Sequence, residues 1–256
     1  MFLHEMFYPE CKPITDLSVF EKFMFKEEPI KVEKEENIFT RLEKECIYSK
    51  GVQDGLFWSM YILQYGYNEY NRNKYNYGKI EVQEKEKIAE YLHKNGSQNI
   101  SKQTNYKLTR GFCCEIESDL ITNPKMSFSG LIGMCAFYKC NIVVVDLMKH
   151  IYYSFCLKEE ETIRETYILY KNPFYTGKIN SNEYFVDIDH KIYSLLELKD
   201  HFFKIDNFQK PMKSITNYKK IELEAIASKV IKEDIEKSLD KNQLYEKILL
   251  FISTEI

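Results

Sequence analysis

The stretch Ser127–Asp146, SFSGLIGMCAFYKCNIVVVD, joins an apolar helix pattern to a run of β-branched residues. In its first half, Ser127 can cap a helix whose inward-facing apolar residues recur at helical spacing. Its second half contains Ile142–Val145, an unbroken β-branched run that is typical of a strand covered on both faces. The stretch therefore predicts a helix over 127–138 that leads directly into the central strand of a sheet.

Several shorter segments after this strand are rich in aromatic and β-branched residues and are separated by turn signals. We expect further strands at Ile151–Phe155, Glu165–Tyr170, Asn182–Ile188 and Lys191–Leu195. Together with the central strand they would form a small mixed sheet in the middle of the chain.

The segments before this region carry helical patterns. Gln53–Tyr70 has apolar residues at helical spacing, and Asp54 is placed to cap its first turn. Glu81–His93 is a second, charged helix that Asn95-Gly96 closes, and the polar residues from 97 to 104 are expected to form a loop. Helices followed by strands predict the α+β class.

Two further apolar stripes follow Lys210-Pro211 and predict a pair of C-terminal helices. The residue pattern of the chain thus changes at two points. We expect an N-terminal arm over 1–45, an α+β domain over 46–203 and a C-terminal helical module over 204–256.

Charge and cysteine content exclude several classes of protein. The 36 Lys and Arg residues against 39 Asp and Glu residues leave a formal charge of -3, so the whole molecule has no field that attracts DNA or an anionic membrane. The longest apolar runs, such as Ile142–Val145 and Ile248–Ile252, are far shorter than the ~20 residues of a membrane span. The seven cysteines lack metal-site spacing, and the N-terminus lacks a secretory-signal pattern. We therefore expect reduced thiols, no metal, no cofactor and no membrane span.

Two groups of residues resemble a family of uncharacterised proteins from large nucleocytoplasmic DNA viruses. The first is Asp54–Tyr61, DGLFWSMY, with the helical residues that follow it. The second lies nearer the C-terminus and comprises Phe203–Asn207, Lys210–Ile215 and Tyr218–Leu223. The resemblance implies a viral protein of the virion or of the infected cell's cytoplasm, with other viral proteins as its partners.

The order of helices and strands also resembles the papain-like and ovarian-tumour-type (OTU) cysteine peptidases, in which the nucleophile opens a helix packed on a sheet. There the helix dipole and free backbone N–H groups stabilise the thiolate, and a neighbouring histidine completes the ion pair. At the matching position this chain has Ser59, whose hydroxyl ionises far less readily than a thiol. The resemblance therefore implies a papain-like or OTU-like core that has lost its nucleophile.

A catalytic set in this layout would also need a histidine on a downstream strand and an acid. His150 and His190 are the histidines of that region, and a lone histidine in a turn is typical of a solvated surface. Asp54 is either a catalytic acid or a helix cap. The candidate catalytic residues are consequently Ser59, Asp54 and His190.

The adjacent pair Cys113-Cys114 is a second place to look for a nucleophile. We expect the pair on a strand, where neighbouring side chains point to opposite faces. No histidine stands near it in the sequence, so the pair does not complete a catalytic set.

The tail over Tyr218–Phe251 resembles a SAP-type helix–extended–helix module, a class that often binds DNA. Phosphate binding needs a net basic face, and the candidate nucleic-acid-binding residues are Lys213, Lys219, Lys220, Lys237 and Lys241. From Lys204 to the end, however, ten lysines face nine acidic residues. An ordinary solvated surface is the alternative interpretation.

Three hypotheses on function follow from these residues. The first is an inactive cysteine-peptidase-like core that serves as a virion, scaffold or interaction component. The second is an active hydrolase, of deubiquitinase or viral-protease type, that uses Ser59 or a nearby cysteine with His150 or His190. The third is a DNA-binding accessory protein that acts through the C-terminal module.

Overall fold

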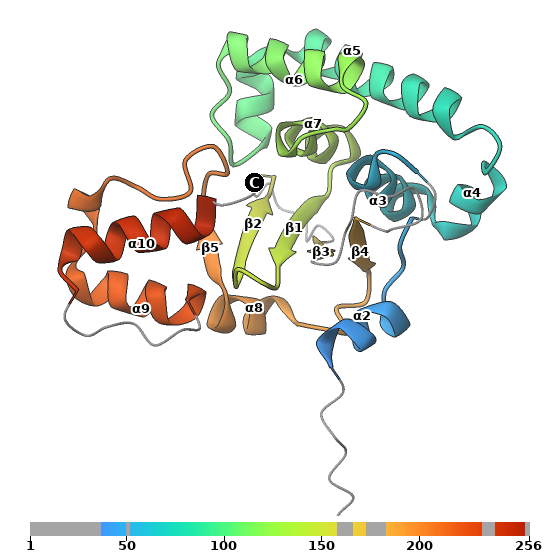
Figure 1. Ribbon diagram of the computed structural model, residues 1–256. Coiled ribbons are helices and arrows are strands. Elements are labelled where there is room, and N and C mark those ends of the chain that lie inside the picture. The colour runs from blue at the N-terminus through green and yellow to red at the C-terminus, as the bar shows by residue number, and fades with distance from the viewer. Residues whose placement is uncertain (1–36, 50–51, 158–165, 173–182, 232–238, 254–256) are drawn as a thin grey trace, which may run out of the picture. The chain divides into compact units, whose positions relative to one another are not determined.

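The β-branched run forms the central strand of a mixed sheet in the computed structural model (Figure 1), which describes residues 37–49, 52–157, 166–172, 183–231 and 239–253. Within those ranges the sheet has five strands in the order β4-β3-β1-β2-β5. Their bounds are β1 Asn141–Asp146, β2 Ile151–Phe155, β3 Thr166–Lys171, β4 Tyr184–Asp187 and β5 Phe203–Ile205. The predicted central strand is confirmed, since β1 lies between β2 and β3.

The helices account for most of the remaining described residues, which confirms the α+β class. They are α2 Ile38–Glu45, α3 Gly55–Tyr65, α4 Tyr67–Arg72, α5 Tyr77–Gln103, α6 Arg110–Thr122, α7 Phe128–Tyr138, α8 Leu195–His201, the 3-10 turn η1 Ile215–Asn217, α9 Lys220–Val230 and α10 Lys241–Ser253. Ser127 caps α7, as predicted, by accepting the backbone N–H of Ser129.

The pairing of the strands shows why the sheet is mixed. β1 runs antiparallel to β2, its neighbour along the chain, and parallel to β3. β3 runs antiparallel to β4, whereas β2 pairs in parallel with the short β5. Two segments far from β1 in sequence, β4 and β5, therefore form the two edges.

Alternate side chains of β1 enter two separate apolar cores. Ile142 and Val144 belong to the larger core, which α3, α5, α6, α7, α9 and α10 also line. Val143 and Val145 belong to the smaller core, which Leu42 of α2 and Leu198 of α8 complete. Because successive strand residues point to opposite faces, the sheet is covered on both sides, as the β-branched run predicted.

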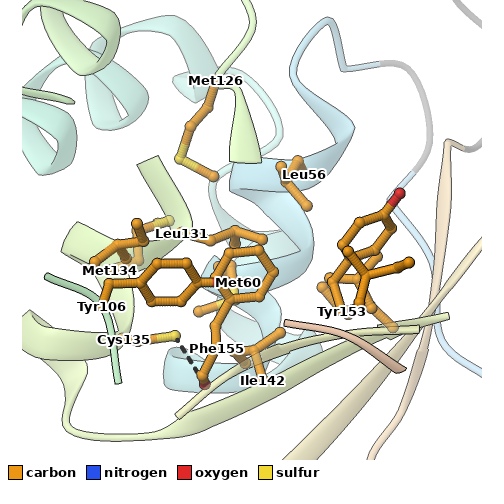
Figure 2. Close-up of a cluster of buried hydrophobic side chains, with 14 of the residues drawn as sticks. Leu56, Met60, Tyr106, Met126, Leu131, Met134, Cys135, Ile142, Tyr153 and Phe155 are labelled. Carbon is orange, nitrogen blue, oxygen red and sulfur yellow. Dashed lines mark hydrogen bonds between the residues drawn. The ribbon is translucent and has the colours of Figure 1, made fainter. Parts of the chain in front are cut away.

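The larger core brings α3 and α7 onto the sheet (Figure 2). Leu56 and Met60 of α3, Leu131 of α7 and Ile142 of β1 are labelled members of this core in Figure 2. Phe155 of β2 accepts a hydrogen bond from the Cys135 thiol through its carbonyl oxygen, at 3.7 Å. The N-terminal end of α3 is thus positioned by a packed apolar layer.

Several elements differ from the sequence-based predictions. The expected helix over 53–70 is two helices, because Gly66 adopts a positive φ of 86° between α3 and α4. The expected loop over 97–104 is wrong, since the helical chain resumes after a kink at Gly96 and continues to Gln103. The strand expected at Cys113-Cys114 is also wrong, because both cysteines lie in α6.

The expected strand over 191–195 is likewise wrong. Ser194 instead forms a capping box with Glu197 and starts α8 at Leu195. The strand that does pair here, β5, is only three residues long and follows α8.

The two C-terminal helices share the larger core with the sheet. Their buried residues are Leu223, Ala227 and Val230 of α9 and Leu244, Ile248 and Ile252 of α10. Lys229 donates from Nζ to the carbonyl of Lys199 at the end of α8, and Lys149 donates to the carbonyl of Ile252. The C-terminal ends of both helices therefore lie against the sheet-bearing part, and Asn37–Ile256 forms one unit. None of the described helices is both long enough and apolar enough to traverse a bilayer.

Leu223→Ala tests whether α9 is an integral part of that core. Leu223 is 0% exposed, so the truncation should lower the free energy of unfolding by about 2–5 kcal/mol in a chemical-denaturation experiment. Ile221→Ala is the matched control on the same helix, because Ile221 is 76% exposed and its truncation should change stability by less than about 0.5 kcal/mol. Equal effects of the two substitutions would show that α9 is not packed as described.

Candidate functional site

The N-terminal end of α3 is organised around the carboxylate of Asp54. Asp54 is 1% exposed, and its Oδ1 accepts the backbone N–H of Phe57 at 3.0 Å, which caps the helix. Its Oδ2 accepts the ammonium of Lys85 and the backbone N–H of Met126, each at 2.7 Å. One side chain therefore ties α3 to α5 and to the segment that enters α7.

Lys85 is the buried partner of this carboxylate. Its Nζ also donates to Glu81 at 2.8 Å, and the other oxygen of Glu81 accepts the indole N–H of Trp58 at 2.9 Å. Burial would lower the pKa of Lys85, but the carboxylates of Asp54 and Glu81 outweigh burial and hold the pKa above its ordinary value. Lys85 consequently stays positively charged inside the protein.

A second buried carboxylate, Glu84, lies on the same helix. It accepts hydrogen bonds from the hydroxyls of Tyr65 and Tyr138 and from the ammonium of Lys87. Burial alone would raise its pKa, but these three donors hold the pKa below the ordinary value. Glu84 therefore remains ionised and joins α3, α5 and α7.

Glu183 packs directly against the start of α3. A Cβ added to Gly55 would lie 2.7 Å from the Cβ of Glu183, which is closer than side chains approach. The Glu183 carboxylate lies 3.5 Å from the ammonium of Lys125. Burial raises the pKa of Glu183 despite that ammonium, and the nearby charge of Asp54 adds to the increase. Gly55 is thus required by the close approach of the residue that precedes β4.

Ser59 lies in the second turn of α3 rather than at its opening. Its side chain is 0% exposed, and its hydroxyl donates to the carbonyl of Gly55 at 2.7 Å. A serine hydroxyl that donates to the carbonyl four residues earlier makes its hydrogen bond within its own helix. The proton that a general base would have to remove is therefore already hydrogen-bonded to the backbone, inside a core without solvent access.

His190 and Asp54 are at opposite ends of β3. The Nε2 of His190 lies 2.7 Å from the carbonyl oxygen of Thr166, the first residue of β3. Glu183, the neighbour of Gly55, instead pairs through its backbone with Asn172, just beyond the last residue of β3. A six-residue strand is about 17–20 Å long. Among the described residues, no hydrogen bond or ion pair joins His190 to Ser59 or Asp54.

His150 also lies apart from α3. Its ring stacks on Phe202, with the ring centroids 5.2 Å apart. Phe202 belongs to the smaller core, on the face of the sheet opposite α3. The structure therefore places the two histidine candidates away from Ser59.

The two adjacent cysteines of α6 differ in their exposure to solvent. Cys113 is buried, and burial, aided by Glu117, raises the pKa of its thiol to about 11. Its sulfur donates to Glu117 at 3.7 Å, whereas Cys114 is exposed. Cys113 is hence protonated at neutral pH and lacks the thiolate that a nucleophile needs.

The lysines suggested for nucleic-acid binding are only partly brought together. The backbone of Lys213 is bonded to the hydroxyls of Tyr218 and Tyr245, which places it near the residues that precede α9 and near the second turn of α10. Lys219 and Lys220 begin α9 and Lys241 begins α10, while Lys237 lies outside the described residues. Lys220 lies 3.9 Å from Glu224, so part of this positive charge is neutralised locally.

Lys85, Glu84 and Glu183 were not among the residues that the sequence analysis selected. A readable signal existed for Lys85, because it precedes Ile88 and Leu92 on the apolar stripe of the same predicted helix. A charged residue on that stripe, four residues after Glu81, indicates a buried ion pair. Nothing local marks Glu183, whose burial comes from a helix far away in the sequence.

Comparison with known proteins provides no relative for this chain. No family model, no curated protein and no solved structure matches it. The described ranges also contain no group of three or more His, Cys, Asp or Glu side chains that could hold a metal ion. Any assignment of function consequently depends on the contacts described above.

Asp54→Ala should be strongly destabilising. The substitution removes a helix cap and leaves Lys85 with one fewer carboxylate in a buried position, which costs about 3–5 kcal/mol in the free energy of unfolding. Glu90→Ala is the matched control, because the Lys94–Glu90 pair of α5 is exposed and should contribute less than about 0.5 kcal/mol. Chemical denaturation of both variants measures the difference, and equal stability would refute the structural role of Asp54.

Gly55→Ala should also destabilise the protein, although alanine favours helices more than glycine does. The new methyl group would meet the Cβ of Glu183, so α3 and the start of β4 must separate at a cost of about 1–3 kcal/mol. Gly78→Ala in the first turn of α5 is the control, since a Cβ there meets no atom within 4 Å. That control should leave the melting temperature unchanged or slightly higher, and a similar result for Gly55→Ala would contradict the close approach.

Proposed function

We propose that this chain is a non-catalytic interaction protein, built on a papain-like or OTU-like core in which the position of the nucleophile serves the fold. Support comes from the placement of α3 on one face of a mixed sheet, with its N-terminal end beside β4. In the viral family that its motifs resemble, such a protein would act as a scaffold or virion component. It would function in the virion or in the cytoplasm of the infected cell, bound to other viral proteins.

The observation that carries the proposal is the internal hydrogen bond of Ser59. A nucleophile must reach substrate, and its base must lie within hydrogen-bonding distance. Ser59 is 0% exposed and donates to Gly55, whereas Asp54 is committed to Lys85, Phe57 and Met126. Ser59 and Asp54 are therefore both engaged in stabilising α3, whereas His190 contacts the carbonyl of Thr166.

A tyrosine surface on α3, α4 and the loop before α5 supports the interaction role. Its exposed members are Tyr65, Tyr67 and Tyr75, the last of which is 91% exposed. Tyr67 stacks on the buried Tyr70, and Tyr70 in turn stacks on Tyr77 with centroids 4.9 Å apart. Tyrosine offers a large contact area with a polar tip and is enriched at protein interfaces. Because Tyr67 is stacked on Tyr70, binding through Tyr67 would cost less side-chain entropy.

Ser59→Cys separates the non-catalytic proposal from an active hydrolase. If the position faces the core, the introduced sulfur should resist alkylation by iodoacetamide in the folded protein and react after unfolding in denaturant. Peptide mapping by mass spectrometry would follow each cysteine separately. Cys114 is the internal positive control, because it is exposed in the native fold.

Two results would overturn the proposal. One is alkylation of the introduced sulfur in the folded variant at the rate of Cys114. The other is covalent labelling of Ser59 in the native protein by a fluorophosphonate, which reacts with activated serines. Either result would require an accessible side chain at this position and would favour the hydrolase.

A further inference from the structure

A groove of about 490 Å³ lies between β5 and residues 206–218, the segment that leads into α9. Its floor is apolar and aromatic, formed by Phe203, Met212 and Tyr218, whereas lysines stand along its rim at Lys204, Lys210 and Lys213. A volume of this size lies within the range of about 300–1,000 Å³ that is usual for ligand clefts. An apolar floor with a charged rim matches a ligand that carries both kinds of group.

The groove is held in place by the core beneath it. Met212 is 2% exposed and belongs to the larger core. The hydroxyl of Tyr218 accepts the backbone N–H of Lys213 at 3.1 Å, and the hydroxyl of Tyr245 donates to the carbonyl of Lys213 at 2.8 Å. The backbone of the rim residue Lys213 is therefore fixed, so a ligand that contacts its ammonium has to order only the side chain and not the backbone.

The groove has a local excess of positive charge. Its three lysines face one carboxylate, Asp206, which lies 3.8 Å from the ammonium of Lys204 and 3.7 Å from that of Lys213. The side chains of Lys204, Lys213 and Asp206 are each about half exposed or more, and ion pairs this exposed are weak. The lysines can therefore turn from Asp206 to an anionic ligand at little cost.

This positive excess is limited at the start of α9. Lys220 lies 3.9 Å from Glu224, and Glu222 accepts the backbone N–H of Lys219 at 2.7 Å. A nucleic-acid strand needs a longer series of lysines to neutralise successive phosphates. A compact ligand with few negative charges fits the groove better.

We propose that the groove binds a short acidic segment of a partner protein in which an apolar side chain stands beside the carboxylates. The apolar side chain contacts Phe203 and Tyr218, which are only partly buried, and the carboxylates contact the lysines of the rim. The site is separate from Ser59, so the inference holds whether or not the protein hydrolyses a bond.

Fluorescence anisotropy with a labelled peptide of sequence Asp-Glu-Phe-Asp-Leu-Glu tests the proposal on the full chain. The matched peptide Asn-Gln-Phe-Asn-Leu-Gln keeps the apolar residues and removes the charges, and it should bind about tenfold more weakly or not at all. Added salt should lower the affinity of the protein for the acidic peptide, because the carboxylates of the peptide contact exposed lysines.

Charge variants of the groove should act in opposite directions. The double substitution Lys210→Glu with Lys213→Glu should lower the affinity for the acidic peptide about tenfold or more. Asp206→Asn should raise that affinity about two- to fivefold, because it removes the competing carboxylate. Lys247→Glu is the control, because Lys247 is exposed on α10 and does not line the groove. A circular-dichroism melt of each variant distinguishes lost binding from lost folding.

Three outcomes would overturn the inference. The acidic peptide binds no better than the neutral one, the groove variants change its affinity no more than Lys247→Glu does, or a labelled single-stranded oligonucleotide binds the groove while the peptide does not. The last outcome would assign the lysines to phosphate groups. None of these results bears on the reactivity of Ser59, so the proposed function would stand or fall separately.

Discussion

The buried ion pair between Asp54 and Lys85 is the contact on which the arrangement of α3 depends. Removing two charges from water is expensive, and a buried pair is favourable only when good geometry and further hydrogen bonds compensate. Here Asp54 accepts three hydrogen bonds, and Lys85 contacts two carboxylates and lies 5.3 Å from the centre of the Phe57 ring. Because these partners come from α3, α5 and the entry to α7, the pair specifies one mutual orientation of the three elements.

That requirement also uses backbone donors at the N-terminal end of α3. In a hydrolase of papain-like layout, unpaired backbone N–H groups at a helix start would stabilise an oxyanion. In this chain the N–H of Phe57 is bonded to Oδ1 of Asp54, and the N–H of Trp58 is bonded to the Asp54 carbonyl at 3.1 Å. The same structural device therefore stabilises the fold, and Ser59, one turn further on, faces inward.

Features set by neighbouring residues could be predicted from the sequence. The run Ile142–Val145, the Asp54 cap and the Ser127 cap are each indicated by residues close together in the sequence, and each is present in the structure. The environment of Ser59 could not be predicted in this way. Every residue of α3 from Gly55 to Ile62 is buried, so the helix has no polar face to indicate which side meets solvent. The separation of His190 from Asp54 depends on strand order, which local patterns do not encode.

The C-terminal helices illustrate how a segment can be both a separate sequence region and part of one core. Their apolar stripes predicted a C-terminal helical module, and Leu223, Leu244 and Ile248 of these helices pack in the same core as the apolar residues of the sheet. A module that moved independently would carry its lysines on a mobile support. Here Tyr245 lies next to the buried Leu244 on α10, and its hydroxyl donates to the carbonyl of Lys213. The backbone at the rim of the groove is therefore connected to the packed core. Charge selection by so few lysines requires such a fixed frame, because a flexible rim would lose in entropy what it gained in attraction.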